Sequence, residues 1–136
     1  MKVTIIKPDG LVSKDGVSVD GLSLSSLPAD TWAVHWDSST SKGTVEKTDL
    51  SVTEITSFTP YESAVTEYDA AYIAAVEDAA EDTVRAERDR RLAESDWMGL
   101  SDTTMPDAWK TYRQALRDLP ANTSDFSNPT WPTEPT

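Results

Sequence analysis

An α+β fold is predicted, in which a small antiparallel β domain is followed by helices. Three observations favour it. The first part of the 136-residue sequence is rich in Val, Ile, Thr and Ser and is punctuated by Asp-Gly dipeptides. The middle part contains no proline from Tyr61 to Met105, and the last part carries an aromatic stripe at helical spacing before a Pro-rich tail. The sequence therefore divides into residues 1–57, 58–94 and 95–136.

The β domain is predicted from turns and short strands. Asp-Gly dipeptides supply positive-φ turn positions between antiparallel strands, and three of them occur, at residues 9–10, 15–16 and 20–21. Trp32, Val34 and Trp36 alternate with smaller or polar residues, which predicts a strand with one buried face. The predicted strands are Val3–Ile6, Gly16–Val19, Trp32–Trp36, Gly43–Lys47 and Ser51–Ile55.

The middle segment, residues 58–94, is predicted to be one long helix. Thr59 and Glu62 match a capping box, with Pro60 at the first helical position. The charged side chains are all acidic from Glu62 to Asp82, after which arginines follow from Arg85, an order that suits the helix dipole. A solvated amphipathic helix explains this pattern. A helix that packs its Ala/Tyr stripe on a partner or on copies of itself is the alternative.

The last segment, residues 95–136, is predicted to form a short helical hairpin and an extended tail. Ser95, Asp96 and Gly99 indicate a chain reversal, Thr104 is a candidate N-cap, and Pro120 is expected to end the second helix. Opposed apolar side chains are expected to hold the hairpin together, namely Leu92, Trp97 and Leu100 against Trp109, Tyr112 and Leu116. In the tail, Phe126 and Trp131 are expected to be anchored by the hairpin or by a neighbouring chain.

Composition argues against several classes of function. The formal net charge of −12 repels nucleic acid. No apolar run is long enough for a bilayer span, and the first ten residues lack a secretion signal, so we expect a protein of the cytoplasm. With no cysteine and with His35 as the single histidine, we expect no metal site, cofactor or catalytic triad. A binding or assembly protein is therefore predicted, not an enzyme.

Several motifs in the last segment occur in a distinctive order. They are Arg91-Leu92, Ser95-Asp96-Trp97, Trp109-Lys110-Thr111-Tyr112-Arg113-Gln114-Ala115-Leu116-Arg117-Asp118 and Trp131-Pro132. This series resembles the C-terminal module of phage tail fibre assembly proteins, also called tail assembly chaperones. The residues Asp15-Gly16-Val17, Ser26-Leu27-Pro28 and Ala33-Val34-His35-Trp36 are similar to the small N-terminal domain that these proteins often carry.

The resemblance implies a chaperone that binds a tail fibre protein in the host cytoplasm and assists its folding, trimerisation or attachment. The alternative is a permanent structural subunit of the tail, baseplate or fibre that remains in the virion. A homo-oligomer formed through residues 60–94 is a further expectation. The candidate partner-binding residues are Arg88, Arg91, Trp97, Trp109, Tyr112, Arg113, Arg117, Phe126, Trp131 and Pro132. For Trp97, Trp109 and Tyr112, packing inside the hairpin is the competing role. For Arg113 and Arg117, it is pairing with Asp118 or with the helix ends.

Overall fold

A computed structural model describes residues 1–136 and confirms the α+β prediction. It contains an antiparallel sheet, one long helix and a C-terminal helix. The chain separates into two compact units, residues 1–74 and 75–136, and the boundary between them falls inside the long helix. We refer to these as unit 1 and unit 2. None of the helices is both long enough and apolar enough to cross a membrane.

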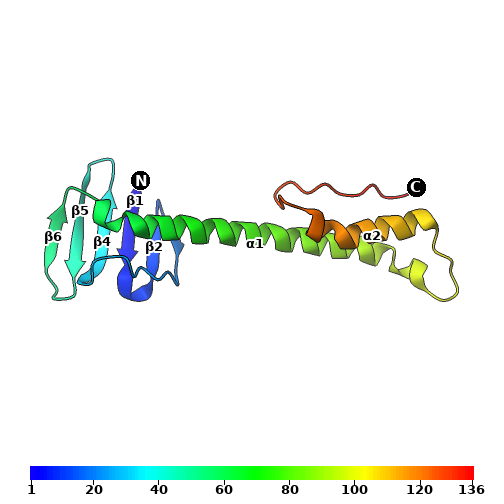
Figure 1. The fold of residues 1–136 in the computed structure, drawn as a ribbon, viewed down its shortest axis with the longest axis horizontal. Helices are drawn as coiled ribbons and strands as arrows, with labels where there is room; N and C mark the ends of the chain where they lie inside the picture. The colour runs from blue at the N-terminus through cyan, green and yellow to red at the C-terminus, as the bar shows by residue number, and fades with distance from the viewer. The chain divides into compact units, whose positions relative to one another are not determined.

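Unit 1 is built on a six-stranded antiparallel sheet with the order β3-β2-β1-β4-β5-β6 (Figure 1). The strand that the sequence did not predict, β2, is a four-residue segment that pairs with β1 and β3. The terminal strands of the sheet are β3 and β6. The strands are β1 (Lys2–Ile6), β2 (Leu11–Lys14), β3 (Val17–Val19), β4 (Thr31–Asp37), β5 (Lys42–Lys47) and β6 (Val52–Ile55), and a 3₁₀ turn, η1 (Lys7–Asp9), joins the first two.

One face of the sheet is covered by the start of the long helix α1 (Glu62–Glu94) and by the loop before β4. Tyr61, Ala64 and Tyr68 recur at helical spacing and are buried against the apolar side chains of the strands. Loop residues Leu24 and Leu27 complete this core. The strand residues of the core are Val3, Ile5, Val12, Val34 and Val45. Since unit 1 has no buried charged residue, it is held together mainly by apolar burial, with the Lys14–Asp69 ion pair at the margin of the core.

The predicted alternation along β4 is wrong at its first position. Thr31 and Ala33 pair with the consecutive residues Lys47 and Glu46, so Trp32 is an extra residue in a β-bulge. Trp32 is 48% exposed, whereas Val34 is fully buried and Trp36 stacks on Phe58 with ring centroids 5.6 Å apart. The bulge moves Trp32 out of the pattern that the sequence suggested.

Gly43 allows β5 to lie close to β4. A Cβ atom at this position would be 2.2 Å from the carbonyl oxygen of His35 and 2.9 Å from the Trp36 ring. Contacts this short require a shift of the backbone, so glycine is needed for steric reasons. The Trp36 side chain then covers the strand where Gly43 has no side chain of its own.

The long helix was predicted accurately at its C-terminal end and less so at its start. α1 ends at Glu94, as expected. Thr59 does not form the predicted cap, because residues Thr59–Tyr61 form a 3₁₀ turn, η2, whose N-cap is Phe58 and which has no side-chain cap hydrogen bond. Beyond Tyr68 the apolar stripe is not covered within unit 1, and Tyr72 and Ile73 are 44% and 55% exposed.

In unit 2 the helix α2 (Asp107–Asn122) runs back beside the end of α1 (Figure 1). The two are joined through the 3₁₀ turn η3 (Asp96–Gly99) and a loop. Pro106, not Thr104, is the N-cap of α2, and Pro120 lies inside the helix, so the prediction that Pro120 ends it is wrong. A proline in the last turn removes only one helical hydrogen bond, and the helix ends soon afterwards. Residues 123–136 form no helix or strand.

Candidate partner-binding site

Arg113 connects the two helices of unit 2. Its side chain is only 10% exposed. One guanidinium nitrogen donates to the backbone oxygen of Leu92 at 2.7 Å and to Ser95 Oγ at 2.5 Å, and the other donates to Asp96 Oδ1 at 2.7 Å. A cation that binds the last carbonyls of a helix also interacts favourably with the helix dipole. Arg113 therefore caps α1 from α2, and in this structure it is not available to a partner.

The two helices of unit 2 also bury apolar residues. Val84 from α1 and Tyr112, Leu116 and Leu119 from α2 are all buried. The Trp109 ring is half-buried and meets Tyr112 edge-on, with ring centroids 5.7 Å apart. Tyr112 is thus a packing residue of the hairpin, and Trp109 packs on it while keeping part of its surface accessible.

The arginines near the end of α1 are paired with carboxylates on the same helix. Glu87 accepts hydrogen bonds from Arg90 and Arg91, and these bonds lower the pKa of its carboxyl from 4.5 to about 2. Arg90 also pairs with Glu94, and Arg88 pairs with Asp89 at 2.6 Å. The pairs that Glu87 and Glu94 form with Arg90 and Arg91 are three or four residues apart and mainly support the helix, whereas Arg88 and Asp89 are adjacent in sequence.

The tail after α2 returns to the side of α1. Trp131 places its ring 4.1 Å from the guanidinium carbon of Arg91, a cation–π contact. Phe126 and Pro132 are half-buried. Arg91, which the sequence proposed as a partner-binding residue, therefore contacts both Glu87 and the chain's own tail.

A different pair of apolar side chains is exposed at the turn between the helices. Trp97, in η3, is 57% exposed, and Leu100, directly after it, is 59% exposed. The prediction that these two residues pack inside the hairpin is therefore wrong. Among the residues named from the sequence, Trp97 offers an apolar surface to a partner. Leu100 was missed as a surface residue, because its apolar character indicated the core.

Arg117 is the one arginine without an ion pair or hydrogen bond in the structure. It lies on α2 one turn after Arg113 and is exposed. All arginines lie in unit 2, and all lysines except Lys110 lie in unit 1. Of the arginines, Arg117 alone has an exposed guanidinium with no intramolecular partner.

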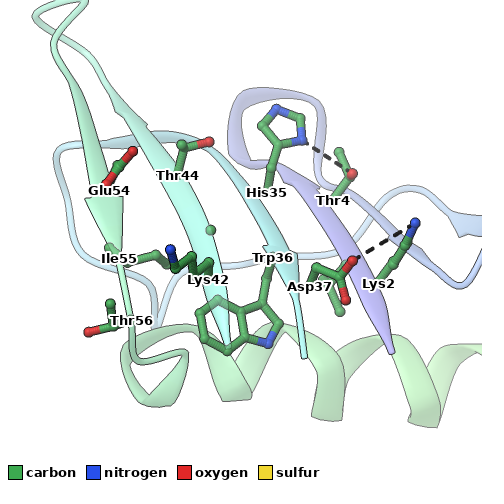
Figure 2. A pocket seen from close by; sticks show the side chains of 12 residues that line it. Lys2, Thr4, His35, Trp36, Asp37, Lys42, Thr44, Glu54, Ile55 and Thr56 are labelled. Atoms are coloured by element: carbon green, nitrogen blue, oxygen red, sulfur yellow. Dashed lines mark hydrogen bonds and ion pairs between the residues drawn. The ribbon is translucent and has the colours of Figure 1, made fainter. Parts of the chain in front are cut away.

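Unit 1 has a separate hollow on the sheet face opposite α1, with a volume of about 560 Å³ (Figure 2). Two rows of polar side chains line it, one containing Thr4, His35, Thr44 and Glu54 and the other Lys2, Asp37, Lys42 and Thr56. Thr4 Oγ1 and His35 Nδ1 are 3.3 Å apart, and Lys2 lies 3.9 Å from Asp37. Nowhere in the chain do three or more His, Cys, Asp or Glu side chains converge as metal ligands.

The hollow has the size of a small-molecule site, and its polar groups lie beside apolar surface from Trp36 and Ile55. Such sites are mostly apolar, with a few polar groups. Val3 belongs to the core on the α1 side of the sheet, and Trp36 packs against that core. The opposite face carries hydroxyl, ammonium, imidazole and carboxylate groups, from residues such as Thr4, Lys2, His35 and Glu54 (Figure 2). The predicted site residues all belong to unit 2, and none of them lines this hollow.

The order of motifs around Arg113 and Trp97 is matched by a known family. Residues 81–136 match the family model of the phage tail assembly chaperone protein. The match begins within α1, includes η3 and α2, and continues through the tail. It confirms the resemblance drawn from the motifs in this part of the chain. No curated protein and no solved structure matches the chain.

The segment that matches the phage tail assembly chaperone model contains both buried and exposed residues of unit 2. The matched segment contains the Arg113 cap, the cation–π contact of the tail and the exposed turn at Trp97. The first two hold the segment together. The third leaves apolar surface uncovered.

Proposed function

We propose that this protein is a non-catalytic chaperone that binds a phage tail fibre protein in the host cytoplasm and assists its folding, trimerisation or attachment. The observation that carries the proposal is the exposed pair Trp97 and Leu100 within the segment that matches the chaperone family. No nucleic acid, membrane or cofactor is part of the proposed activity.

Trp97 and Leu100 have the properties of an interface anchor. Tryptophan is enriched among the residues that contribute most to protein–protein binding, and burial of an exposed apolar side chain stabilises a complex. The turn that carries them is fixed to the hairpin, because Asp96 accepts a hydrogen bond from Arg113. Within the turn, the hydroxyl of Thr103 donates to the backbone oxygens of Trp97 and Leu100. A turn fixed in this way loses little conformational freedom on binding.

Arg117 would add charge to the same unit. An exposed guanidinium without an internal partner can pair with a carboxylate of the fibre at little cost in existing interactions. A contact at the rim of an interface contributes more to the association rate than to affinity. We therefore assign Arg117 the smaller part of the binding free energy and the Trp97 turn the larger part.

The proposal is tested by co-expressing the chain with the tail fibre protein of the same phage and measuring the yield of soluble trimeric fibre. We expect the yield to fall several-fold when Trp97→Ala and Leu100→Ala are combined. Trp32→Ala is a matched control, because Trp32 is exposed to a similar degree but lies in unit 1. An equal yield of trimers without the protein would show that the chaperone role is wrong.

The alternative function is that of a permanent subunit of the tail, baseplate or fibre, and the exposed Tyr72 and Ile73 on α1 favour it. A helix that remains assembled with a partner or with copies of itself would bury these side chains. Stoichiometric peptides of this chain in purified particles, detected by mass spectrometry, would support the structural role. Analytical ultracentrifugation of the protein alone, with Ile73→Glu for comparison, would test self-association.

A further inference from the structure

We propose that β6 of unit 1 binds an extended, lysine- or arginine-bearing segment of a partner polypeptide as a seventh strand of the sheet. The inference concerns a different unit from the one that carries the proposed fibre contact, and it stands independently of that proposal. It rests on the open hydrogen-bonding edge of β6, on an exposed leucine in an unfavourable conformation beside it, and on the charges along the edge.

Two residues of β6 direct their backbone N–H and C=O groups away from β5, where another strand could bind them. The backbone N–H of Lys47 donates to the oxygen of Ser51 at 2.9 Å, so the pair 47–51 is hydrogen-bonded. In an antiparallel ladder such pairs alternate with non-bonded ones. Val45–Thr53 and Gly43–Ile55 are then bonded pairs, while Val52 and Glu54 direct their N–H and C=O groups away from β5.

β6 is a short edge strand with one charged residue, Glu54, but it has no proline, lysine or bulge. Natural sheets guard their edges with proline, lysine or a bulge. β6 has the sequence Val-Thr-Glu-Ile, and it pairs with β5 without a bulge. Val52 is 63% exposed, and Thr53 and Glu54 are exposed as well. The opposite edge, β3, is shorter by one residue.

Leu50, in the turn before β6, is unfavourable in two respects. It is 90% exposed, and its φ of 68° lies in the left-handed region that favours glycine. Three other non-glycine residues of unit 1 share this conformation, so the exposed apolar side chain is what distinguishes Leu50. An incoming strand beside Val52 would cover the Leu50 side chain and remove its apolar surface from water.

Charge decides which occupant suits the edge. Glu46, the cross-strand partner of Val52, and Glu54 lie on the same face, and neither forms an ion pair within the chain. A basic side chain placed opposite Glu54 would contribute a favourable cross-strand pair. A second copy of this chain would instead bring two acidic edges together, in a protein that already has a net charge of −12.

The experiment uses the whole protein and a synthetic peptide of about nine alternating lysine and valine residues, long enough to span β6. Hydrogen exchange of individual amides is followed by NMR. We expect the exchange of the Val52 and Glu54 amides to slow at least tenfold on peptide binding, while the Thr53 amide, already bonded to β5, changes little. A peptide with glutamate in place of lysine should not bind.

Two variants separate the backbone and charge contributions. Glu54→Pro removes an outward N–H without removing a bond to β5 and should weaken peptide binding about fivefold or more. Glu54→Gln keeps the N–H and should weaken binding to a smaller extent. Unchanged affinity in both variants, binding of the glutamate peptide, or failure of the lysine peptide to bind would each overturn the proposal. Self-association that protects the same two amides would identify a second copy as the occupant and overturn the proposed partner.

Discussion

The two units have small cores that are stabilised by different kinds of residues. Unit 1 buries aliphatic and aromatic side chains between a sheet and the first turns of α1, and no charged side chain enters that cluster. Unit 2 has few buried apolar residues and places Arg113 among them, where it binds the end of α1. Apolar packing tolerates many substitutions of similar volume. A buried cation depends on specific acceptors, so unit 2 should be the more sensitive to the loss of a single polar group.

The largest effect is expected from Arg113→Ala. Truncation removes the hydrogen bonds that Arg113 donates to Ser95 Oγ, to the Leu92 carbonyl and to Asp96, and we expect unit 2 to lose about 3 kcal/mol of stability. Urea unfolding followed by far-UV circular dichroism measures this loss. Arg117→Ala is the matched control, and it should change stability by less than about 0.5 kcal/mol because that side chain is exposed and unpaired. Equal effects of the two variants would contradict the role of Arg113 as a cap.

A smaller effect, confined to unit 1, is expected from Gly43→Ala. The new methyl group would meet the His35 carbonyl and the Trp36 ring, and relief of this overlap should cost about 2 kcal/mol. Urea unfolding followed by far-UV circular dichroism measures this cost. Gly99→Ala in unit 2 is the control, since a Cβ atom there meets no other atom within 4 Å. If neither substitution changed the stability, the steric contact between Gly43 and β4 would be contradicted.

The smallest effect is expected from acid titration of Glu87. The pKa of its carboxyl is about 2 in the folded chain against a usual 4.5, because Arg90 and Arg91 donate hydrogen bonds to it. A lowered pKa means that the stabilising contribution is fully present above pH 4.5 and is lost as the pH falls toward 2. Thermal unfolding across this range should show a shallower decline for Glu87→Gln than for the wild type. Glu77→Gln should decline as the wild type does.

The large elements of the fold were predictable because their signals are local. The helix to Glu94 follows from an uninterrupted stretch without proline, and most strands follow from β-branched runs between turn residues. β2 was missed because Leu11 and Val12 are adjacent and two polar residues follow them, so the segment shows no alternation. The bulge at Trp32 could not be predicted, because it depends on the register between β4 and β5. The alternation of side chains within one strand carries no information on that register.

The partner-binding residues were harder to predict for a related reason. Spacing on a helix indicates which residues share a face, but not which of them a second helix covers. Arg113 and Arg117 are one turn apart on α2, yet one is buried and the other exposed. Trp97 and Leu100 have the composition of core residues and lie in a turn instead. Only the register of the two helices of unit 2 distinguishes these cases.

The separation of lysine and arginine between the units has a practical consequence. Five of the six lysines, Lys2, Lys7, Lys14, Lys42 and Lys47, belong to unit 1, whereas unit 2 has only Lys110. Amine-reactive cross-linkers will therefore report mainly on the neighbours of the sheet and will leave the Trp97 turn almost unsampled. Carboxylate-directed or photoactivated reagents, placed at the exposed acids of η3 and its loop, are the appropriate chemistry for trapping whatever binds unit 2.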